Sequence, residues 1–200
     1  MLRTPWGYKV DADELPALIS AEQYALLAGI TLAAETTPRV TATLAAVSAA
    51  VRGYCGWHIA PVMRCQSRVT GEGRMLRLPT LALLSVDAIE IDGDAVDIDG
   101  VEHLDSGLVR VSCGRWPHAW GGVVVDYTSG LDVALAPDLA AIVAQVASNA
   151  MAGAPGVASE RAGEVSITYN STAYGVAGGV TLLDRDKALL APYRLPPIPR

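Results

Sequence analysis

The chain has 200 residues, of which 51% are hydrophobic, and it carries a formal net charge of -6. That length suits one ordinary core with a small appendage rather than two full domains. An acidic chain argues against tight nucleic-acid binding, which needs a basic surface to release counterions from phosphates. No run reaches the ~18 uninterrupted apolar residues of a membrane-spanning helix, and the start, from Met1 to acidic Asp11, does not resemble a signal peptide. We expect a protein made in a cytoplasm, with no membrane contact, whose excess apolar surface serves subunit contacts.

Cysteine and histidine side chains show no spacing typical of a disulfide framework or a metal site. The three cysteines are widely spaced in the sequence, at Cys55, Cys65 and Cys113. The three histidines are also widely spaced, at His58, His103 and His118. A zinc site would need CxxC pairs or closely spaced histidines. We expect reduced cysteines, isolated or packed histidines, no metal and no cofactor.

Four aspartates crowd into one short segment, at Asp92, Asp94, Asp97 and Asp99. A calcium loop needs oxygen ligands at alternate positions closed by a distant Glu, whereas Val96 stands where a ligand should be. Asp and the neighbouring glycines also favour tight turns for their own reasons. The segment is therefore interpreted as solvated hairpin turns.

Two helices are predicted in the first third of the chain. Ser20 followed by Gln23 is a capping-box pattern, which predicts a short helix near residues 20–28 that ends at Gly29. A longer helix near residues 38–55 has a proline in its first turn and apolar residues at four-three spacing. Its apolar stripe consists of Val40, Leu44, Val47, Val51 and Tyr54.

A change of apolar period from helical to twofold predicts an inserted small antiparallel β part over residues 61–128. Residues 62–69 and 75–79 are expected to pair as a hairpin around a Gly-rich turn. The remaining predicted strands cover residues 86–91, 108–112 and 123–128, with a turn at Asp92–Asp94 after the first of them.

A further amphipathic helix is predicted over residues 137–152, with a proline at its start and a glycine after its end. Beyond it lie a strand-like run at Val165–Tyr169 and a Gly-rich stretch interpreted as a linker. The predicted fold class is α+β: a helical body with its β insertion in residues 1–153, and an extended C-terminal arm in residues 154–200.

The predicted arm ends in a proline-rich segment with apolar side chains between the prolines. Three prolines in the last five residues remove backbone donors, so this end is expected to be extended rather than helical. An extended segment has no evident core of its own, and we expect another molecule to order it. The candidate interface residues are Leu189, Leu190, Pro192, Tyr193, Arg194, Leu195 and Pro196.

Sequence motifs of catalysis and nucleotide binding are absent. The chain has no G-x-S-x-G elbow, no G-x-x-x-x-G-K loop and no G-x-G-x-x-G after a strand. We therefore predict that the protein is not an enzyme.

A series of short motifs, in a fixed order, resembles phage head-tail connector proteins over about residues 15–195. In chain order these motifs are Leu18–Tyr24, Val51–Trp57, Leu78–Leu81, Val86–Ile89, Trp116–Pro117, Val123–Leu131, Ala136–Leu139, Gly163–Tyr169 and Leu189–Arg194. The resemblance implies a head-to-tail adaptor, a structural protein of a tailed bacteriophage without catalytic residues.

As such an adaptor, the chain would form a homo-oligomeric ring, usually twelvefold, that docks under the portal protein in the neck of the virion. The ring would contact a downstream neck or tail protein and pass double-stranded DNA through its centre without sequence-specific binding. The C-terminal arm would contact the portal or an adjacent subunit, and assembly would take place in the host cytoplasm.

Three other functions remain open from the sequence. Another neck or tail-completion protein would bind the tail rather than the portal. A small metal-dependent enzyme requires that the aspartates or histidines converge in space. A monomeric ligand-binding β module requires an apolar pocket.

Overall fold

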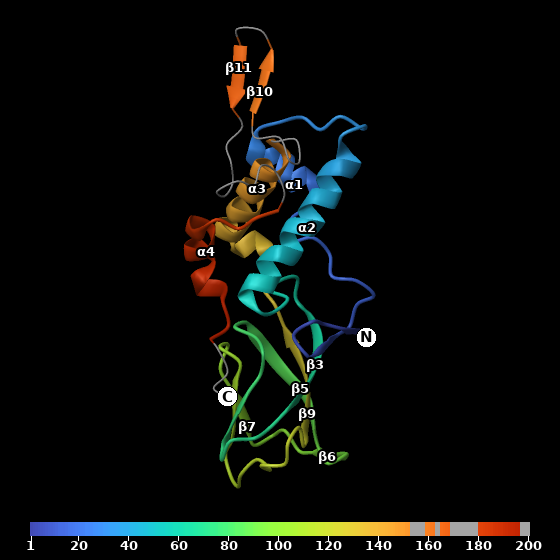
Figure 1. Ribbon diagram of the computed structural model, residues 1–200. Coiled ribbons are helices and arrows are strands. Elements are labelled where there is room, and N and C mark those ends of the chain that lie inside the picture. Colours follow the sequence, from blue (N-terminus) through green and yellow to red (C-terminus); the bar gives the residue numbers. More distant parts are fainter. Residues whose placement is uncertain (153–158, 163–164, 169–179, 197–200) are drawn as a thin grey trace. The chain divides into compact units, whose positions relative to one another are not determined.

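The computed structural model describes residues 1–152, 159–162, 165–168 and 180–196, which form two units (Figure 1). Unit 1 is β-rich and unit 2 is mainly helical, so the predicted α+β class is confirmed. Unit 1 combines Met1–Leu15, Gly56–Asp132 and the C-terminal Leu195 and Pro196. Unit 2 combines Pro16–Cys55 with the described residues of Val133–Arg194.

Unit 1 contains a six-stranded antiparallel sheet with the order β1-β2-β3-β9-β5-β6. Its strands are β1 (Leu2–Arg3), β2 (Lys9–Val10), β3 (Met63–Val69), β5 (Leu83–Ile91), β6 (Asp94–Val96) and β9 (Val123–Ser129). Every second residue of β9 is buried, in agreement with the predicted period of two. The sheet extends beyond the predicted insertion at 61–128, because β1 and β2 come from the N-terminus.

A second sheet of three strands has the order β4-β8-β7, with β4 at Met75–Arg77, β7 at Val101–His103 and β8 at Leu108–Val111. The predicted hairpin between residues 62–69 and 75–79 is therefore wrong, because β4 pairs with β8. Both edges of β3 are already occupied, by β2 and by β9. A local apolar period cannot reveal pairing with strands so distant in the sequence.

The glycine turn between β3 and β4 packs against a buried tryptophan instead of closing a hairpin. Gly71 donates a backbone hydrogen bond of 3.3 Å to the Pro117 carbonyl, and Trp116 donates one of 2.7 Å to the Gly73 carbonyl. A Cβ at Gly71 would collide with the Trp116 side chain, so only glycine fits there.

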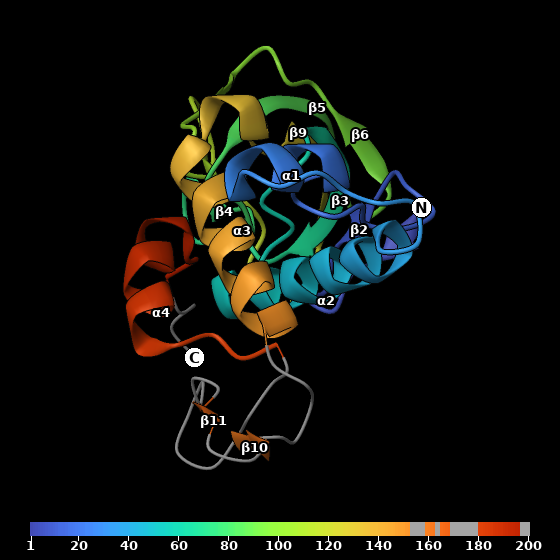
Figure 2. The same cartoon turned by 90° about the horizontal axis from the view of Figure 1, so that it is seen from above.

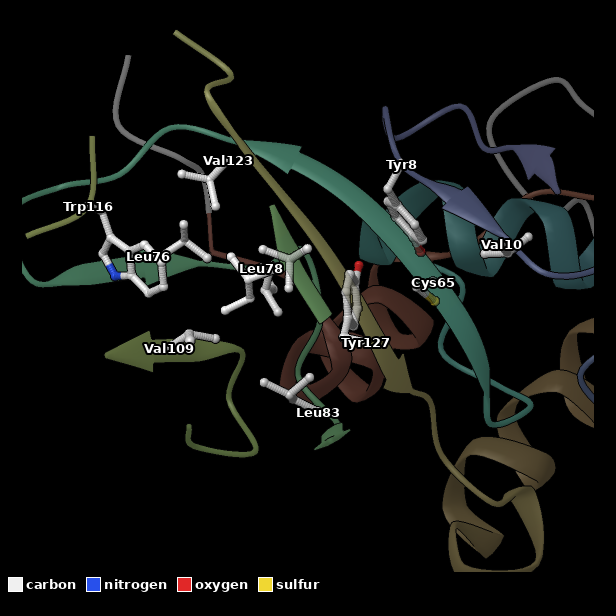
Figure 3. Close-up of a cluster of buried hydrophobic side chains, with 12 residues drawn as sticks. Tyr8, Val10, Cys65, Leu76, Leu78, Leu83, Val109, Trp116, Val123 and Tyr127 are labelled. Atoms are coloured by element: carbon white, nitrogen blue, oxygen red, sulfur yellow. The ribbon is translucent and has the colours of Figure 1, made fainter. Parts of the chain in front are cut away.

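The core of unit 1 joins residues from both sheets and from the N-terminus. Figure 3 shows Leu76, Val109 and Trp116 gathered at one end of this cluster, and Tyr8 and Cys65 at the other. The side chains of Leu76 and Val109 are each 1% exposed. At ~25 cal/mol per Å² of apolar surface removed from water, such a cluster is the main stabilising contribution to this unit.

The aspartate-rich segment forms the predicted tight turn. Ile91 pairs with Asp94, so Asp92 and Gly93 form a two-residue hairpin loop between β5 and β6. Both loop residues have positive φ, 54° and 97°, as a type I′ turn requires.

Unit 2 is built around the helices α1 (Ala21–Ala28), α2 (Thr37–Cys55) and α3 (Pro137–Ala152), all three of which confirm predicted helices. The unit also contains η1 (Val133–Leu135), the paired strands β10 (Ser159–Ala162) and β11 (Val165–Thr168), α4 (Asp184–Leu190) and η2 (Ala191–Tyr193). The capping box is present, since Gln23 N–H donates to Ser20 Oγ and Ser20 N–H donates to Gln23 Oε1.

Helix α3 packs against α1, α2 and α4 (Figures 1 and 2). The predicted stripe of α2 faces this core, with Leu44, Val47 and Val51 at most 1% exposed. Leu139 and Val143 of α3 are completely buried. This packing places α4 and Tyr193 of η2 beside α3.

The predicted extended arm is wrong for residues 184–193, which form α4 and η2. Asp184 and Asp186 lie in the first turn of α4, where carboxylates suit the positive end of a helix. Residues 197–200 and the Gly-rich linker lie outside the described residues, as does Tyr169. The division into a body (1–153) and an arm (154–200) stays a prediction as a domain boundary.

Candidate functional site

The candidate interface residues divide between the two units. Leu189–Arg194 lie on α4, on η2 and at the end of η2 in unit 2, whereas Leu195 and Pro196 belong to unit 1. The prediction that another molecule orders this segment is wrong for α4 and η2. Helix α4 packs on α2 and α3 of the same chain, and Tyr193 of η2 bonds to Asp138 of α3.

Two adjacent leucines at the end of α4 face opposite environments. Leu190 is 0% exposed and Leu189 is 58% exposed. Leu190 is thus a core residue of unit 2, and Leu189 is available to a partner. The N-terminus of α4 is fixed by the Asp186 carboxylate, which accepts a 3.0 Å hydrogen bond from the Leu183 N–H.

Tyr193 links η2 to the first turn of α3. Its hydroxyl donates a 2.7 Å hydrogen bond to the Asp138 carboxylate. This hydrogen bond holds the pKa of Asp138 below its ordinary value. Partial burial, followed by the hydrogen bond to Asp138 and its negative charge, raises the pKa of Tyr193 to about 12. Tyr193 is therefore neutral, and donates, throughout the physiological range.

Arg194 stacks on an aromatic side chain at the end of α2. Its guanidinium carbon lies 5.2 Å from the centre of the Tyr54 ring, a cation–π arrangement. The Tyr54 hydroxyl in turn donates a 3.1 Å hydrogen bond to the carbonyl oxygen of Lys187 in α4. Tyr54 therefore contacts α4 through Lys187 and the residue that follows η2, Arg194.

Leu195 and Pro196 line a cavity of about 300 Å³ in unit 1. Leu195 lies against Gly56, and the cavity wall also includes Trp6 and Arg77. A ligand-binding β module would require an apolar pocket. The wall of this cavity contains two arginines and residues of the chain's own C-terminus, so its lining is not purely apolar.

Sequence reasoning missed several exposed apolar side chains outside the C-terminal segment. Leu26 is 84% exposed and Ile30 is 48% exposed, at the end of α1, and Leu135 of η1 is 84% exposed. Trp120 in unit 1 is 96% exposed. The sequence does carry one signal for the exposed side chains of α1. Leu26, Leu27 and Ile30 lie on either side of Gly29, the glycine predicted to end this helix.

The only histidine that is fully buried in the described chain has a structural environment. The His58 Nε2 atom lies 3.2 Å from the Ser129 carbonyl oxygen, which can only accept, so this nitrogen carries the proton. The Nδ1 atom then accepts from the Tyr8 hydroxyl at 2.9 Å, and the same hydroxyl accepts from the His58 N–H. Through these hydrogen bonds, His58 connects Tyr8, near the N-terminus, with Ser129 at the end of β9.

Two of the cysteine thiols are buried. Burial raises the pKa of the Cys55 thiol to about 12 and that of Cys65 to about 11, so both are inert. Within the described residues, no three His, Cys, Asp or Glu side chains converge as metal ligands would. In the same part of the chain, no helix has the length and apolar character needed to cross a bilayer.

The sequence from Ala17 to Gln145 matches the model of the head completion protein family. The chain belongs to the head completion protein family. Membership confirms the resemblance to head-tail connector proteins and makes the chain a structural protein of a phage-type virion, not an enzyme. A search of curated proteins finds no match.

Solved structures of gene transfer agent (GTA) particles contain chains with the same fold. A chain from the neck of an empty GTA particle with C6 symmetry has 19% identity and a TM-score of 0.54, with 96% of each chain covered. One from the neck of a native GTA particle with C12 symmetry has 18% identity and a TM-score of 0.52, over 95% of this chain and 97% of that one. A chain from a native GTA virion has 20% identity and a TM-score of 0.55, with 96% of each covered.

Proposed function

We propose that this head completion protein is a head-to-tail adaptor: a homo-oligomeric ring, twelvefold, that docks under the portal in the virion neck. The observation that carries the proposal is the fold shared, over almost the whole of both chains, with chains of neck structures computed with C6 and C12 symmetry. Because a ring of identical subunits repeats one contact, each copy needs two different contact surfaces.

The exposed apolar side chains support subunit assembly. A leucine that is more than half exposed, such as Leu26 or Leu189, contributes its apolar area only when a partner covers it. Of the candidate interface residues, four are exposed, and we propose these for contact with the portal or a neighbouring subunit: Leu189, Pro192, Arg194 and Pro196. Tyr193 and Leu190 act instead within the subunit.

The charge of the chain agrees with a conduit for double-stranded DNA. A lumen rich in Lys and Arg would bind phosphates and slow the passage of DNA. The formal net charge of -6 disfavours such binding. We therefore propose that DNA passes through the ring without sequence-specific contact.

A portal-binding experiment tests this function. The purified chain is mixed with assembled portal rings, and separately with purified tails, and the bound fraction is measured by co-sedimentation. The adaptor function predicts saturable binding to the portal. Binding to the tail alone would instead favour the second candidate, a neck or tail-completion protein, which the head completion family name also accommodates. Binding to neither particle would contradict both.

A further inference from the structure

Helix α1 ends in a fixed cluster of exposed apolar side chains, Leu26, Leu27 and Ile30, here called the α1 surface. Their exposures are 84%, 49% and 48%. Gly29 adopts a left-handed conformation, and the Ile30 N–H donates a 3.0 Å hydrogen bond to the Ala25 carbonyl. Together with the Gly29 bond to Leu26, this is a Schellman cap, which holds Ile30 beside the last turn. Single exposed leucines are ordinary, but three held together at one helix end form a patch.

A second exposed surface lies on α4 and η2. It consists of Leu189 and Pro192 with the cations Arg185 and Arg194, here called the α4 surface. Leu189 is 58% exposed, and the side chain of Arg185 is 61% exposed. Apolar area bordered by cations suits a partner that is apolar and acidic.

The two surfaces differ in charge. In α1, Glu22 precedes Leu26 by one turn on the same face, and this helix has no lysine or arginine. In α4, Arg185 precedes Leu189 by one turn in the same way, while the exposed Asp184 pairs with Lys187. The charge beside Leu26 is therefore negative and the charge beside Leu189 positive, as complementary contact surfaces would be.

The two surfaces lie on different sides of α3 and cannot meet within one subunit. The Tyr24 hydroxyl of α1 lies 3.1 Å from Ser148 Oγ, and the Tyr193 hydroxyl bonds to Asp138. Ser148 and Asp138 are ten residues apart, about 15 Å along a helix that rises 1.5 Å per residue. Figures 1 and 2 both show α3 between α1 and α4.

We propose that the α1 surface of one copy packs against the α4 surface of the next copy, as the repeated contact of the ring. This inference rests on the proposed function, because it assumes that copies of the chain form a ring. Two different surfaces in contact make a heterologous interface, and such an interface generates a closed ring when the rotation between copies closes. The partner is thus a second copy of this chain.

Two substitutions and one matched control test the contact. Leu26→Gln places an uncharged polar side chain in the α1 surface, because a carboxylate there would face the cations of the α4 surface. Leu189→Glu places a carboxylate in the α4 surface. Leu104→Glu is the control, because Leu104 is 60% exposed in the β7–β8 loop of unit 1. Light scattering of the full-length chain, alone and with portal rings, gives the concentration at which half the chain is assembled. Each of the first two variants is expected to raise that concentration at least tenfold, and the control to leave it unchanged.

Mixing the two variants identifies the interface as heterologous. A Leu26→Gln copy retains its α4 surface and a Leu189→Glu copy retains its α1 surface, so an equimolar mixture is expected to form two-subunit complexes that cannot grow. Normal rings from either variant, or no such complex well above the wild-type midpoint, would overturn the contact. Thermal melting of each variant checks that it is folded, and Leu26→Ser and Leu189→Ser replace any variant that is not. Failure of the wild-type chain to form rings would overturn the proposed function as well, which separates the two outcomes.

Discussion

Tyr193 shows how a residue with the character of an interface anchor can serve its own subunit. Its hydroxyl bonds to Asp138, and its neighbour Arg194 covers the Tyr54 ring. Aromatic and arginine side chains are enriched at the centres of interfaces, so the sequence favoured an intermolecular role for this pair. Residue type cannot distinguish an intermolecular contact from an intramolecular one, because both use the same side-chain chemistry.

Replacing Tyr193 with Phe should lower the free energy of unfolding by about 0.5–1 kcal/mol near neutral pH, since the bond to Asp138 is exposed. The lowered pKa of Asp138 means that this contribution is present above the ordinary carboxyl pKa and is lost as the pH falls through the lowered value. Because the pKa of Tyr193 is raised to about 12, the stability contributed by this hydrogen bond is also lost as the pH rises from about 10 towards 12.

Urea unfolding of the wild type and Tyr193→Phe between pH 2 and pH 11 measures this difference. It should be largest between about pH 5 and pH 9 and shrink at both ends. A difference that does not change with pH would show that the hydroxyl does not act through the carboxylate of Asp138.

Tyr8 belongs to a buried hydrogen-bond network that no sequence pattern indicated. Tyr8→Phe removes the hydroxyl that both donates to His58 Nδ1 and accepts from the His58 N–H. We expect a loss of about 1–3 kcal/mol in the free energy of unfolding, because these groups are buried. Tyr24→Phe, which removes one part-buried bond to Ser148, is the matched control. A loss no larger than that of the control would contradict the network.

At the scale of elements, α1, α2 and α3 could be predicted because their ends carry strong local signals. The Ser20 capping box, the prolines near the start of α2 and α3, and the glycines after the ends determine where each helix begins and ends. Helix α4 was missed because it has only seven residues and the prolines that follow it suggested an extended chain. Strand partners were mispredicted where pairing is distant, as for β4 and β8.

The docking of α4 is tested by two adjacent substitutions. Leu190→Ala should lower the free energy of unfolding by about 2–3 kcal/mol, because Leu190 is completely buried. Leu189→Ala should change it by less than about 0.5 kcal/mol, because Leu189 is largely exposed. Thermal or urea unfolding provides both values. Equal, small effects would mean that α4 does not pack on its own subunit.

At the scale of the whole molecule, each unit is assembled from segments far apart in the sequence. The N-terminal strands complete the sheet of unit 1, and α4 completes the helices of unit 2. The fold class and the family resemblance could be inferred from local periods and motif order. The candidate interface could be inferred only in part, because the exposure of Leu189 and the burial of Leu190 depend on packing between distant helices.

The function proposed for the molecule requires that its copies close into a ring. Electron microscopy of the full-length chain bound to purified portal rings tests this directly, by class averages viewed along the ring axis. The account predicts a closed ring of twelve copies with an open centre, coaxial with the portal. Single copies scattered on the portal, or an open chain of copies that never closes, would contradict it.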